Sequence, residues 1–270
     1  MRRLALLAGA ILVIALIVTG CSNSTKPSLG TVRISLTDAP ADYDSVILVI
    51  REVAVHMAGP DDAGWTSFVP DSSRYDLLRL RNGVFSELGA LLVQAGHYTQ
   101  VRLILDPGSY VVENGVRRDI VIPSGLQTGL KLVGEFDVPA DQIVDLGIDF
   151  DAARSFHETG SGTLMLKPTA KVQVISLSGS IRGTVQPAEP PSLVYAIAGP
   201  DTVGSAIPAG DGVFVIPMLL PGSYTVAIDA PAAYRDTALA GVGVSSGQKT
   251  NVGTIVLAPV SASTATWAAK

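Results

Sequence analysis

Short apolar segments separated by turn residues constrain the fold of this sequence most. Twenty-seven glycines and 17 prolines divide the 270 residues into runs rich in Val, Ile, Leu, Thr and Tyr. The run "SVILVIREVAVHM" (45–57) is continuously apolar at first and then alternates, which is typical of a long strand that starts in the middle of a sheet. Such runs recur with little helical periodicity, so the sequence predicts an all-β protein.

Two further runs indicate strands with one buried face. "YTQVRLIL" (98–105) and "LKLVGEF" (130–136) both alternate apolar and polar residues. In "SELGALLVQAG" (86–96), by contrast, a short helix or a wide turn competes with a strand.

A change of composition near "SLSGS" (176–180) predicts a boundary between two β-sandwich domains in tandem. We expect the first domain to span residues 30–177 and the second, with seven short strands or fewer, residues 178–258. Asp211-Gly212 predicts a turn in the second domain. Residues 259–270 look like a frayed tail.

The N-terminus has the features of a lipoprotein signal peptide. Residues 1–20 run from two arginines through an apolar segment to small residues, the order of an export signal. Cys21 is the only cysteine, and "VTGCS" resembles a bacterial lipobox, which implies cleavage before Cys21 and acylation of its thiol. An uncleaved membrane anchor with an incidental cysteine is the alternative. Residues 21–29 read as a lipidated cysteine and a flexible tether, and Ser22 favours sorting to the outer membrane or cell surface.

The net charge argues against two classes of partner. The chain carries a net charge of −5, and loss of Arg2 and Arg3 with the signal peptide leaves 17 basic and 24 acidic residues, a net charge of −7. These values disfavour nucleic acid and a polybasic lipid-binding face. The expected partners are the membrane, through the lipid anchor, and a glycan or an envelope protein.

Five segments of the first domain carry a family resemblance: "VRISLTDAP" (32–40), "AGHYTQVRLIL" (95–105), "PSGLQTGLKLVG" (123–134), "DFDAARSF" (149–156) and "LKPTAKV" (166–172). In this order they resemble one bacterial family, the domain of unknown function 4382. The resemblance implies a secreted or lipid-anchored β-domain, with no catalytic residues to carry over.

Three segments of the second domain carry another family resemblance: "SGSIRGTV" (178–185), "GVFVIPMLLPGSYTVAI" (212–228) and "TNVGTIVL" (250–257). Through them the domain is similar to the carboxypeptidase-regulatory, prealbumin-like β-sandwich. This similarity implies a spacer beside surface domains or, by relation to carbohydrate-binding-like folds, a glycan-binding module.

The segment "DLGIDFDAARS" (145–155) raises the question of a calcium site. In an extended strand, residues two apart lie about 6.8 Å from each other, so Asp149 and Asp151 could converge on one Ca²⁺, whereas Asp145 joins only if Gly147 bends the strand. The alternative is a solvent-facing strand whose carboxylates are neutralised by a cross-strand Lys167 or Lys171. No other cofactor is expected.

Evidence for catalysis is weak. Asp149 and Asp151 could be imagined as a glycosidase pair, but two aspartates on an exposed strand face would have little burial to separate their pKa values. Residues 243–247 match G-x-S-x-G around Ser245, yet a strand rather than a helix is expected to follow, as in a simple turn. The three histidines have no metal-ligand spacing.

Two other groups of residues have both a binding and a structural interpretation. Asp38, Asp42 and Asp44 surround Pro40, where bonds to nearby backbone would fix a turn and calcium is the minority alternative. Exposed aromatic residues would mark a glycan platform, whereas buried ones would belong to the core. The candidates are Trp65, Tyr75, Tyr110 and Tyr195.

Together these features predict a non-enzymatic cell-envelope lipoprotein. We expect it to act as a surface binding or adhesion module for carbohydrate or protein. The alternatives are a structural spacer in envelope assembly and a hydrolase of an extracellular polymer.

Overall fold

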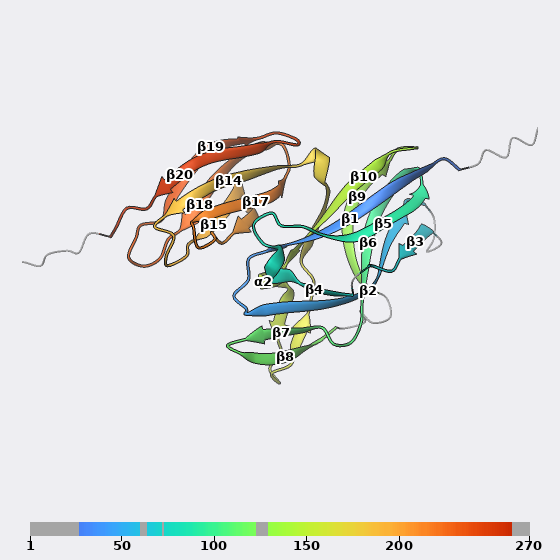
Figure 1. Ribbon diagram of the computed structural model, residues 1–270, viewed down its shortest axis with the longest axis horizontal. Coiled ribbons are helices and arrows are strands. Elements are labelled where there is room, and N and C mark those ends of the chain that lie inside the picture. Colours follow the sequence, from blue (N-terminus) through green and yellow to red (C-terminus); the bar gives the residue numbers. More distant parts are fainter. Residues whose placement is uncertain (1–26, 60–63, 72, 123–128, 261–270) are drawn as a thin grey trace, which may run out of the picture.

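The computed structural model describes residues 27–59, 64–71, 73–122 and 129–260, and it is an all-β protein. Figure 1 shows two stacks of sheets beside each other, one in blue to yellow-green and the other in yellow to red. Each stack has its own hydrophobic cluster, one drawn from residues 32–172 and the other from residues 181–257. We call the two units the first and second sandwich.

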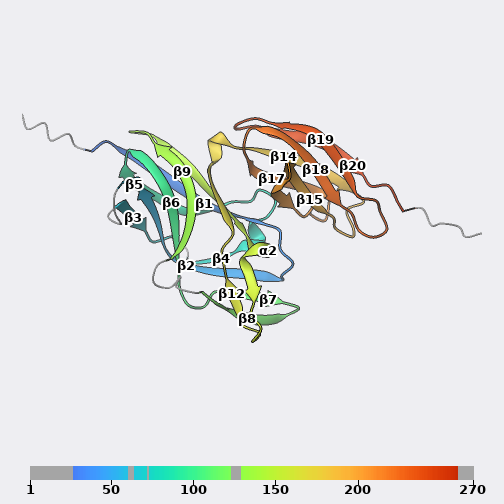
Figure 2. The same ribbon diagram turned by 180° about the vertical axis from the view of Figure 1, so that it is seen from behind.

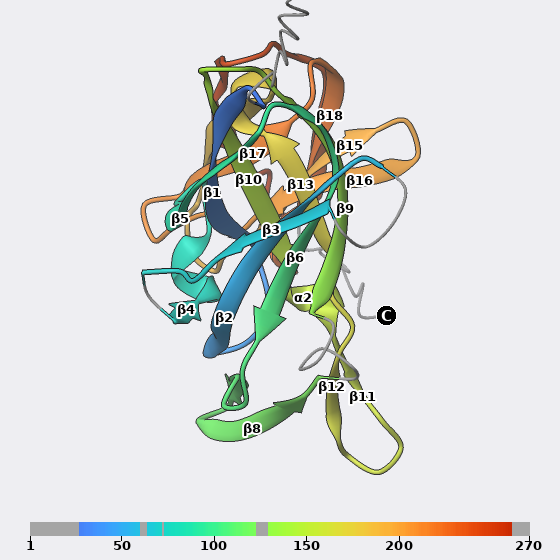
Figure 3. The same cartoon turned by 90° about the vertical axis from the view of Figure 1, so that its right-hand side faces the viewer.

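A four-stranded and a nine-stranded sheet form the first sandwich, in the orders β13-β10-β1-β5 and β11-β12-β8-β7-β2-β6-β9, with β3 and β4 also paired to β2. Figure 3 shows β8, β11 and β12 extending from one end of this sandwich. Its strands are β1 (Leu29–Ala39), β2 (Ser45–Met57), β3 (Trp65–Phe68), β4 (Arg74–Asp76), β5 (Ser86–Gln94), β6 (Gly96–Leu105), β7 (Tyr110–Glu113), β8 (Val116–Val121), β9 (Leu130–Val138), β10 (Ile143–Asp151), β11 (Phe156–Glu158), β12 (Leu164–Leu166) and β13 (Ala170–Val174).

The predicted strands are present where the alternation of residues placed them. The run 45–57 is strand β2, which pairs with β4 and β7 near its start and with β3 and β6 near its end. Val101, Leu103 and Leu105 of β6 are fully buried, as one apolar face requires. Residues 86–94 form strand β5, so the competing helix or wide turn at 86–96 is wrong. Pairing with β1 overrides the local preference, because every β5 residue except Leu88, where the register shifts, has a partner there.

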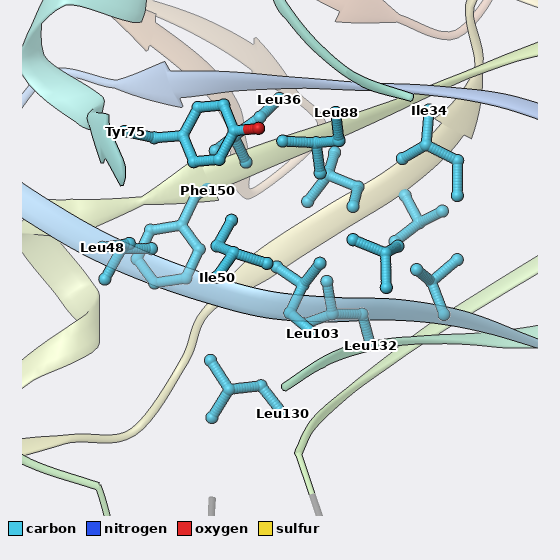
Figure 4. Close-up of a cluster of buried hydrophobic side chains, with 14 of the residues drawn as sticks. Ile34, Leu36, Leu48, Ile50, Tyr75, Leu88, Leu103, Leu130, Leu132 and Phe150 are labelled. Atoms are coloured by element: carbon cyan, nitrogen blue, oxygen red, sulfur yellow. The ribbon is translucent and has the colours of Figure 1, made fainter. Parts of the chain in front are cut away.

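Side chains from both sheets fill the first core. Figure 4 shows Ile34 and Leu36 of β1 and Leu88 of β5 above Leu48 and Ile50 of β2, with Phe150 of β10 among them. All six are fully buried. The alternation of buried and exposed positions along β1 and β2 places these residues on facing surfaces.

Helices are few and short in the described part of the chain. They are the four-residue helix α2 (Ala152–Ser155) and the 3-10 helices η2 (Leu77–Leu80) and η3 (Ile175–Leu177). Across the described residues, the helices are all too short or too polar to span a bilayer.

The second sandwich packs sheet β17-β14-β20 against sheet β16-β15-β18-β19, as the view from behind in Figure 2 shows. Fully buried Phe214 and Val226 come from opposite sheets. Its strands are β14 (Gly179–Gln186), β15 (Leu193–Ala198), β16 (Asp201–Ala206), β17 (Val213–Leu219), β18 (Gly222–Asp229), β19 (Thr237–Val244) and β20 (Lys249–Val256).

The turn predicted at Asp211-Gly212 leads into β17. The carboxylate of Asp211 accepts a hydrogen bond from the backbone N–H of Val213, and Gly212 has a left-handed φ of +81°. A Cβ atom on Gly212 would lie 2.3 Å from the carbonyl oxygen of Val185 in β14. Both the backbone angle and this close approach therefore require glycine here.

We predict that Gly212→Ala lowers the free energy of unfolding of the second sandwich by about 2 kcal/mol or more, because alanine is strained at positive φ and its Cβ would push β14 away. Chemical denaturation followed by circular dichroism measures the change. Gly210→Ala is the matched control, since a Cβ there has nothing within 4 Å. Equal stability of the two variants would contradict the prediction.

Candidate functional site

The strongest candidate site is a groove of about 560 Å³ where the two sandwiches meet. The first sandwich contributes the segment after η2, which Figure 1 shows in teal reaching toward the second sandwich. The second contributes the outer face of β14 and β17 and the turn before β20. The groove is lined by Asn82, Gly83, Phe85, Ile175, Ser178, Gly179, Ser180, Arg182, Val213, Val215, Pro217, Met218, Gly247, Gln248 and Lys249.

The wall from the first sandwich is held at both ends. The hydroxyl of Thr37 in β1 lies 2.8 Å from the carbonyl oxygen of Leu80 and 2.9 Å from that of Val84. The contact region between the two sandwiches is called the seam. Across it, the side-chain amide of Asn82 donates to the carbonyl oxygen of Ile207, 2.8 Å away. Gly83 has a φ of +74°, and a Cβ there would lie only 3.0 Å from Val215. These contacts fix the wall without any ligand.

Outward-facing residues of β14 and its two neighbours form the floor. Arg182 of β14 lies opposite Val215 of β17, and Ser180 lies opposite Lys249 of β20. Residues two apart on a strand share a face, so Ser180 and Arg182 point the same way. The register therefore places both cationic side chains on one sheet face.

A second, smaller hollow of about 230 Å³ on the seam contains the carboxylates singled out in the sequence. Asp149 of β10 pairs directly with Lys171 of β13 in the antiparallel register, and the two charged groups lie 3.4 Å apart. The Lys171 ammonium also donates to the carbonyl oxygen of Val203 in β16, 3.1 Å away. Burial raises the pKa of the Asp149 carboxyl, and Lys171 opposes that rise. The ion pair thus also links the two sandwiches.

Asp151 and Asp145 have different partners. Asp151 caps α2 by accepting from the backbone N–H of Arg154 at 2.9 Å, and it also pairs with the Arg154 guanidinium. Asp145 pairs with Arg33, which lies directly opposite on β1. Each of the three carboxylates is therefore neutralised by its own cation.

These contacts correct one expectation and leave another open. The face carrying Asp149 and Asp151 is not fully open to solvent. Each of the two side chains is only 13% exposed, and β16 lies next to them. Lys171, one of the two proposed cross-strand partners, does pair with Asp149. Among the residues described, no three His, Cys, Asp or Glu side chains gather into a metal-binding group. The calcium site at Asp149 and Asp151 stays a prediction, and the cationic partners favour the structural alternative.

Asp38 is the most perturbed group of this region. Its side chain is almost fully buried, one carboxyl oxygen accepts from the backbone N–H of Ala152 at 3.1 Å, and the other has no partner among the described residues. Burial raises its pKa from 3.8 to about 9, and the nearby Asp149 and Asp151 add to the rise. Asp38 is therefore protonated at neutral pH.

The bond from Asp38 also corrects the expectation of a local turn. Ala152 lies 114 residues away, and Asp44 accepts from the backbone N–H of Gly115, 71 residues away. These carboxylates connect distant segments, because β1 pairs with β10 and the loop after β1 reaches the β7–β8 turn.

The four aromatic candidates do not form one platform. Tyr75 is 5% exposed and belongs to the core cluster of the first sandwich shown in Figure 4, which favours the structural alternative for this residue. Trp65, on β3, is covered by the guanidinium of Arg102, 3.8 Å from the ring centre. Tyr110 on β7 and Tyr195 on β15 are partly exposed, but they belong to different sandwiches.

The G-x-S-x-G match is a turn between strands. Ser245 lies between β19 and β20, where its carbonyl oxygen accepts from the backbone N–H of Gln248 at 3.1 Å. The helix that a nucleophile elbow needs does not follow, as the sequence indicated.

Sequence reasoning missed the residues of the groove. No motif marks Phe85, Arg182 or Lys249 as site residues. Their alternate positions on predicted strands were the available signal, but the wall that turns this face into a groove comes from residues about 100 positions earlier.

We predict that Asp38→Asn removes a fall in stability at high pH. Between pH 4 and pH 9 the folded protein holds a proton on Asp38 that the unfolded chain releases, so the free energy of unfolding decreases as pH rises through this window. Asparagine keeps the acceptor for Ala152 but does not ionise. Urea denaturation should show the variant close to wild type at pH 4–5 and clearly more stable at pH 8–9. Parallel pH profiles for the two proteins would refute this assignment.

Comparisons with solved structures gave distant matches. A type II cohesin–X-dockerin complex from Acetivibrio cellulolyticus is 22% identical, with 29% of this chain and 56% of that chain covered and a TM-score of 0.25. The minor pilin of Streptococcus agalactiae is 10% identical, with 85% and 96% covered and a TM-score of 0.23. A shaft pilin from Lactobacillus rhamnosus GG is 8% identical, with 87% and 98% covered and a TM-score of 0.26.

The chain thus spans little more than half of the first of these structures. A search of curated proteins found no match. Family models gave one assignment: residues 29–168 match the family described as "Domain of unknown function (DUF4382)". This match covers more than half of the chain, so the protein belongs to the DUF4382 family.

Proposed function

We propose that this protein is a non-enzymatic, exported surface lipoprotein that binds an extracellular ligand in the groove between its sandwiches. The observation that carries the proposal is that both sandwiches build the groove. Its volume of about 560 Å³ is within the usual range for small-ligand sites. A binding or adhesion module needs such a preformed recess and no catalytic group.

Contacts on the seam support binding by a rigid site. Lys171 and Asn82 of the first sandwich each donate to a backbone carbonyl of the second. A ligand that meets walls already in position loses less free energy to ordering the protein. These contacts also favour a second candidate function, a spacer of fixed shape in envelope assembly.

The domain limits are part of the proposal. We assign residues 30–177 to the family domain, residues 178–258 to a carboxypeptidase-regulatory-like domain and residues 259–270 to a tail. Seven strands in two packed sheets are consistent with this second assignment. Hydrolysis is disfavoured, because Asp149 and Asp151 are committed to Lys171 and Arg154.

Anchoring rests on the sequence alone, since residues 1–26, Cys21 among them, lie outside the described residues. The proposed signal peptide ends at residue 20, and an acylated Cys21 would hold both sandwiches at the membrane, more plausibly the outer membrane, facing the cell surface. The flexible segment 21–29 would allow both sandwiches to extend away from the membrane surface.

We predict that Cys21→Ala releases the protein from membranes, because the proposed lipid attachment requires this cysteine. Fractionation of intact bacterial cells, with a palmitate analogue as label, measures both association and acylation. Ser22→Ala should remain membrane-bound and labelled. Unchanged association of the Cys21→Ala protein would exclude the lipid anchor.

The groove is tested by filling it. Ser180 and Thr184 both lie on β14, face outward and are partly exposed, but only Ser180 lines the groove. We predict that full-length protein in detergent micelles binds at least one member of a panel of neutral and acidic polysaccharides in biolayer interferometry. Ser180→Trp should abolish this binding, and Thr184→Trp should keep it.

Thermal melts of both tryptophan variants control for folding. If no polysaccharide binds, or if the Ser180→Trp protein binds as wild type does, the groove is not the binding site. The spacer function would then be the better explanation.

A further inference from the structure

The groove carries positive charge in a protein whose net charge is negative. Its lining contains Arg182 and Lys249 and no aspartate or glutamate. Both side chains are exposed, and within the described part of the chain neither forms an ion pair. The carboxylate of Asp211, the acid just before β17, accepts a hydrogen bond from the backbone N–H of Val213. This positive charge is therefore available to a ligand.

Geometry allows the two cations to act together. Lys249 of β20 lies opposite Ser180 of β14, and these two strands are parallel neighbours. Ser180 is two positions before Arg182 on β14. Strand spacing and residue rise then put the two Cα atoms roughly 8 Å apart on one face. Side chains of this length can reach one carboxylate or two neighbouring ones, and the arginine can bind such a group through two hydrogen bonds.

The rest of the lining suits a ring that bears hydroxyl groups. Phe85 is partly exposed, and it lines the groove together with the apolar residues Val215 and Pro217. Ser180 and Gln248 supply a hydroxyl and an amide that form no side-chain hydrogen bond among the described residues. An aromatic surface, neutral polar groups and cations together match a sugar ring with a carboxylate.

An acidic peptide is the competing ligand, and the floor of the groove disfavours it. Extended peptides bind by adding a strand to an open sheet edge. Here the middle strand, β14, is already hydrogen-bonded to β17 and β20, and it presents side chains rather than free backbone.

We propose that the groove binds carboxylate-bearing sugars of an extracellular polysaccharide, with Arg182 and Lys249 as the carboxylate ligands and Phe85 as the packing surface. This inference rests on the proposed function and specifies its ligand class. Neutral glycans lack the group that the two cations recognise.

Trigalacturonic acid and its methyl ester test the charge requirement, because they share the same rings and differ in the carboxylates. Isothermal titration of the full-length protein in micelles should show binding of the acid at least about tenfold tighter than that of the ester. Arg182→Gln and Lys249→Gln should each weaken binding of the acid by about tenfold, as loss of a charged hydrogen bond does. Arg235→Gln, an exposed arginine outside the groove, removes the same charge and should change little.

The outcomes separate this inference from the proposed function. Equal binding of acid and ester, lost in Ser180→Trp, would keep the groove as a binding site and overturn the carboxylate preference. Binding of hexaglutamate without binding of trigalacturonic acid would overturn the sugar class. If all three probes fail, the acidic-sugar inference is wrong, whereas a panel polysaccharide blocked by Ser180→Trp would still support the proposed function.

Discussion

Parallel pairing of β1 with β10 is the constraint on which the rest of the molecule depends. These strands lie more than one hundred residues apart in sequence, yet they share nine consecutive register pairs, from Thr31 with Ile143 to Ala39 with Asp151. Parallel neighbours cannot be joined by a tight hairpin, so the chain between them must leave the sheet and return. That intervening chain forms most of the opposite sheet, and the pairing closes the core between the two.

The same pairing determines the chemistry of the seam. It places Asp38 close to the segment that carries Asp149 and Asp151, and the latter two line the hollow at the second sandwich. Three carboxyl groups in one region of low polarity cannot all be ionised without cost. Asp38 is protonated at neutral pH, whereas Asp149 and Asp151 are each paired with a cation. Lys171 pairs with Asp149 of the first sandwich and donates to a backbone carbonyl of the second, so the contact between the sandwiches depends on this ion pair.

Patterns within single segments predicted the positions of the strands, but they did not predict the order of the strands in each sheet. The alternation within 45–57, 98–105 and 130–136 identified β2, β6 and β9, because one-sided burial leaves a period of two in the sequence. At 86–96 the pattern was ambiguous, and only pairing with β1 decided it. The burial of Tyr75 was not predictable for a similar reason: nothing in the sequence around it shows that β4 packs onto the core of the first sandwich. Sheet order is a property of distant pairs, and single segments do not contain it.

The groove shows why net charge is a poor guide to a single site. The negative net charge argued against nucleic acid as a partner, and that argument concerns the electrostatic field of the whole molecule. At physiological salt a charge is screened beyond about 8 Å, so a bound group responds chiefly to its immediate neighbours. In the groove those neighbours are Arg182 and Lys249, while the acids nearest the seam are protonated or paired. An acidic chain can therefore hold a locally cationic site, and only the fold reveals which of its cations are left uncompensated.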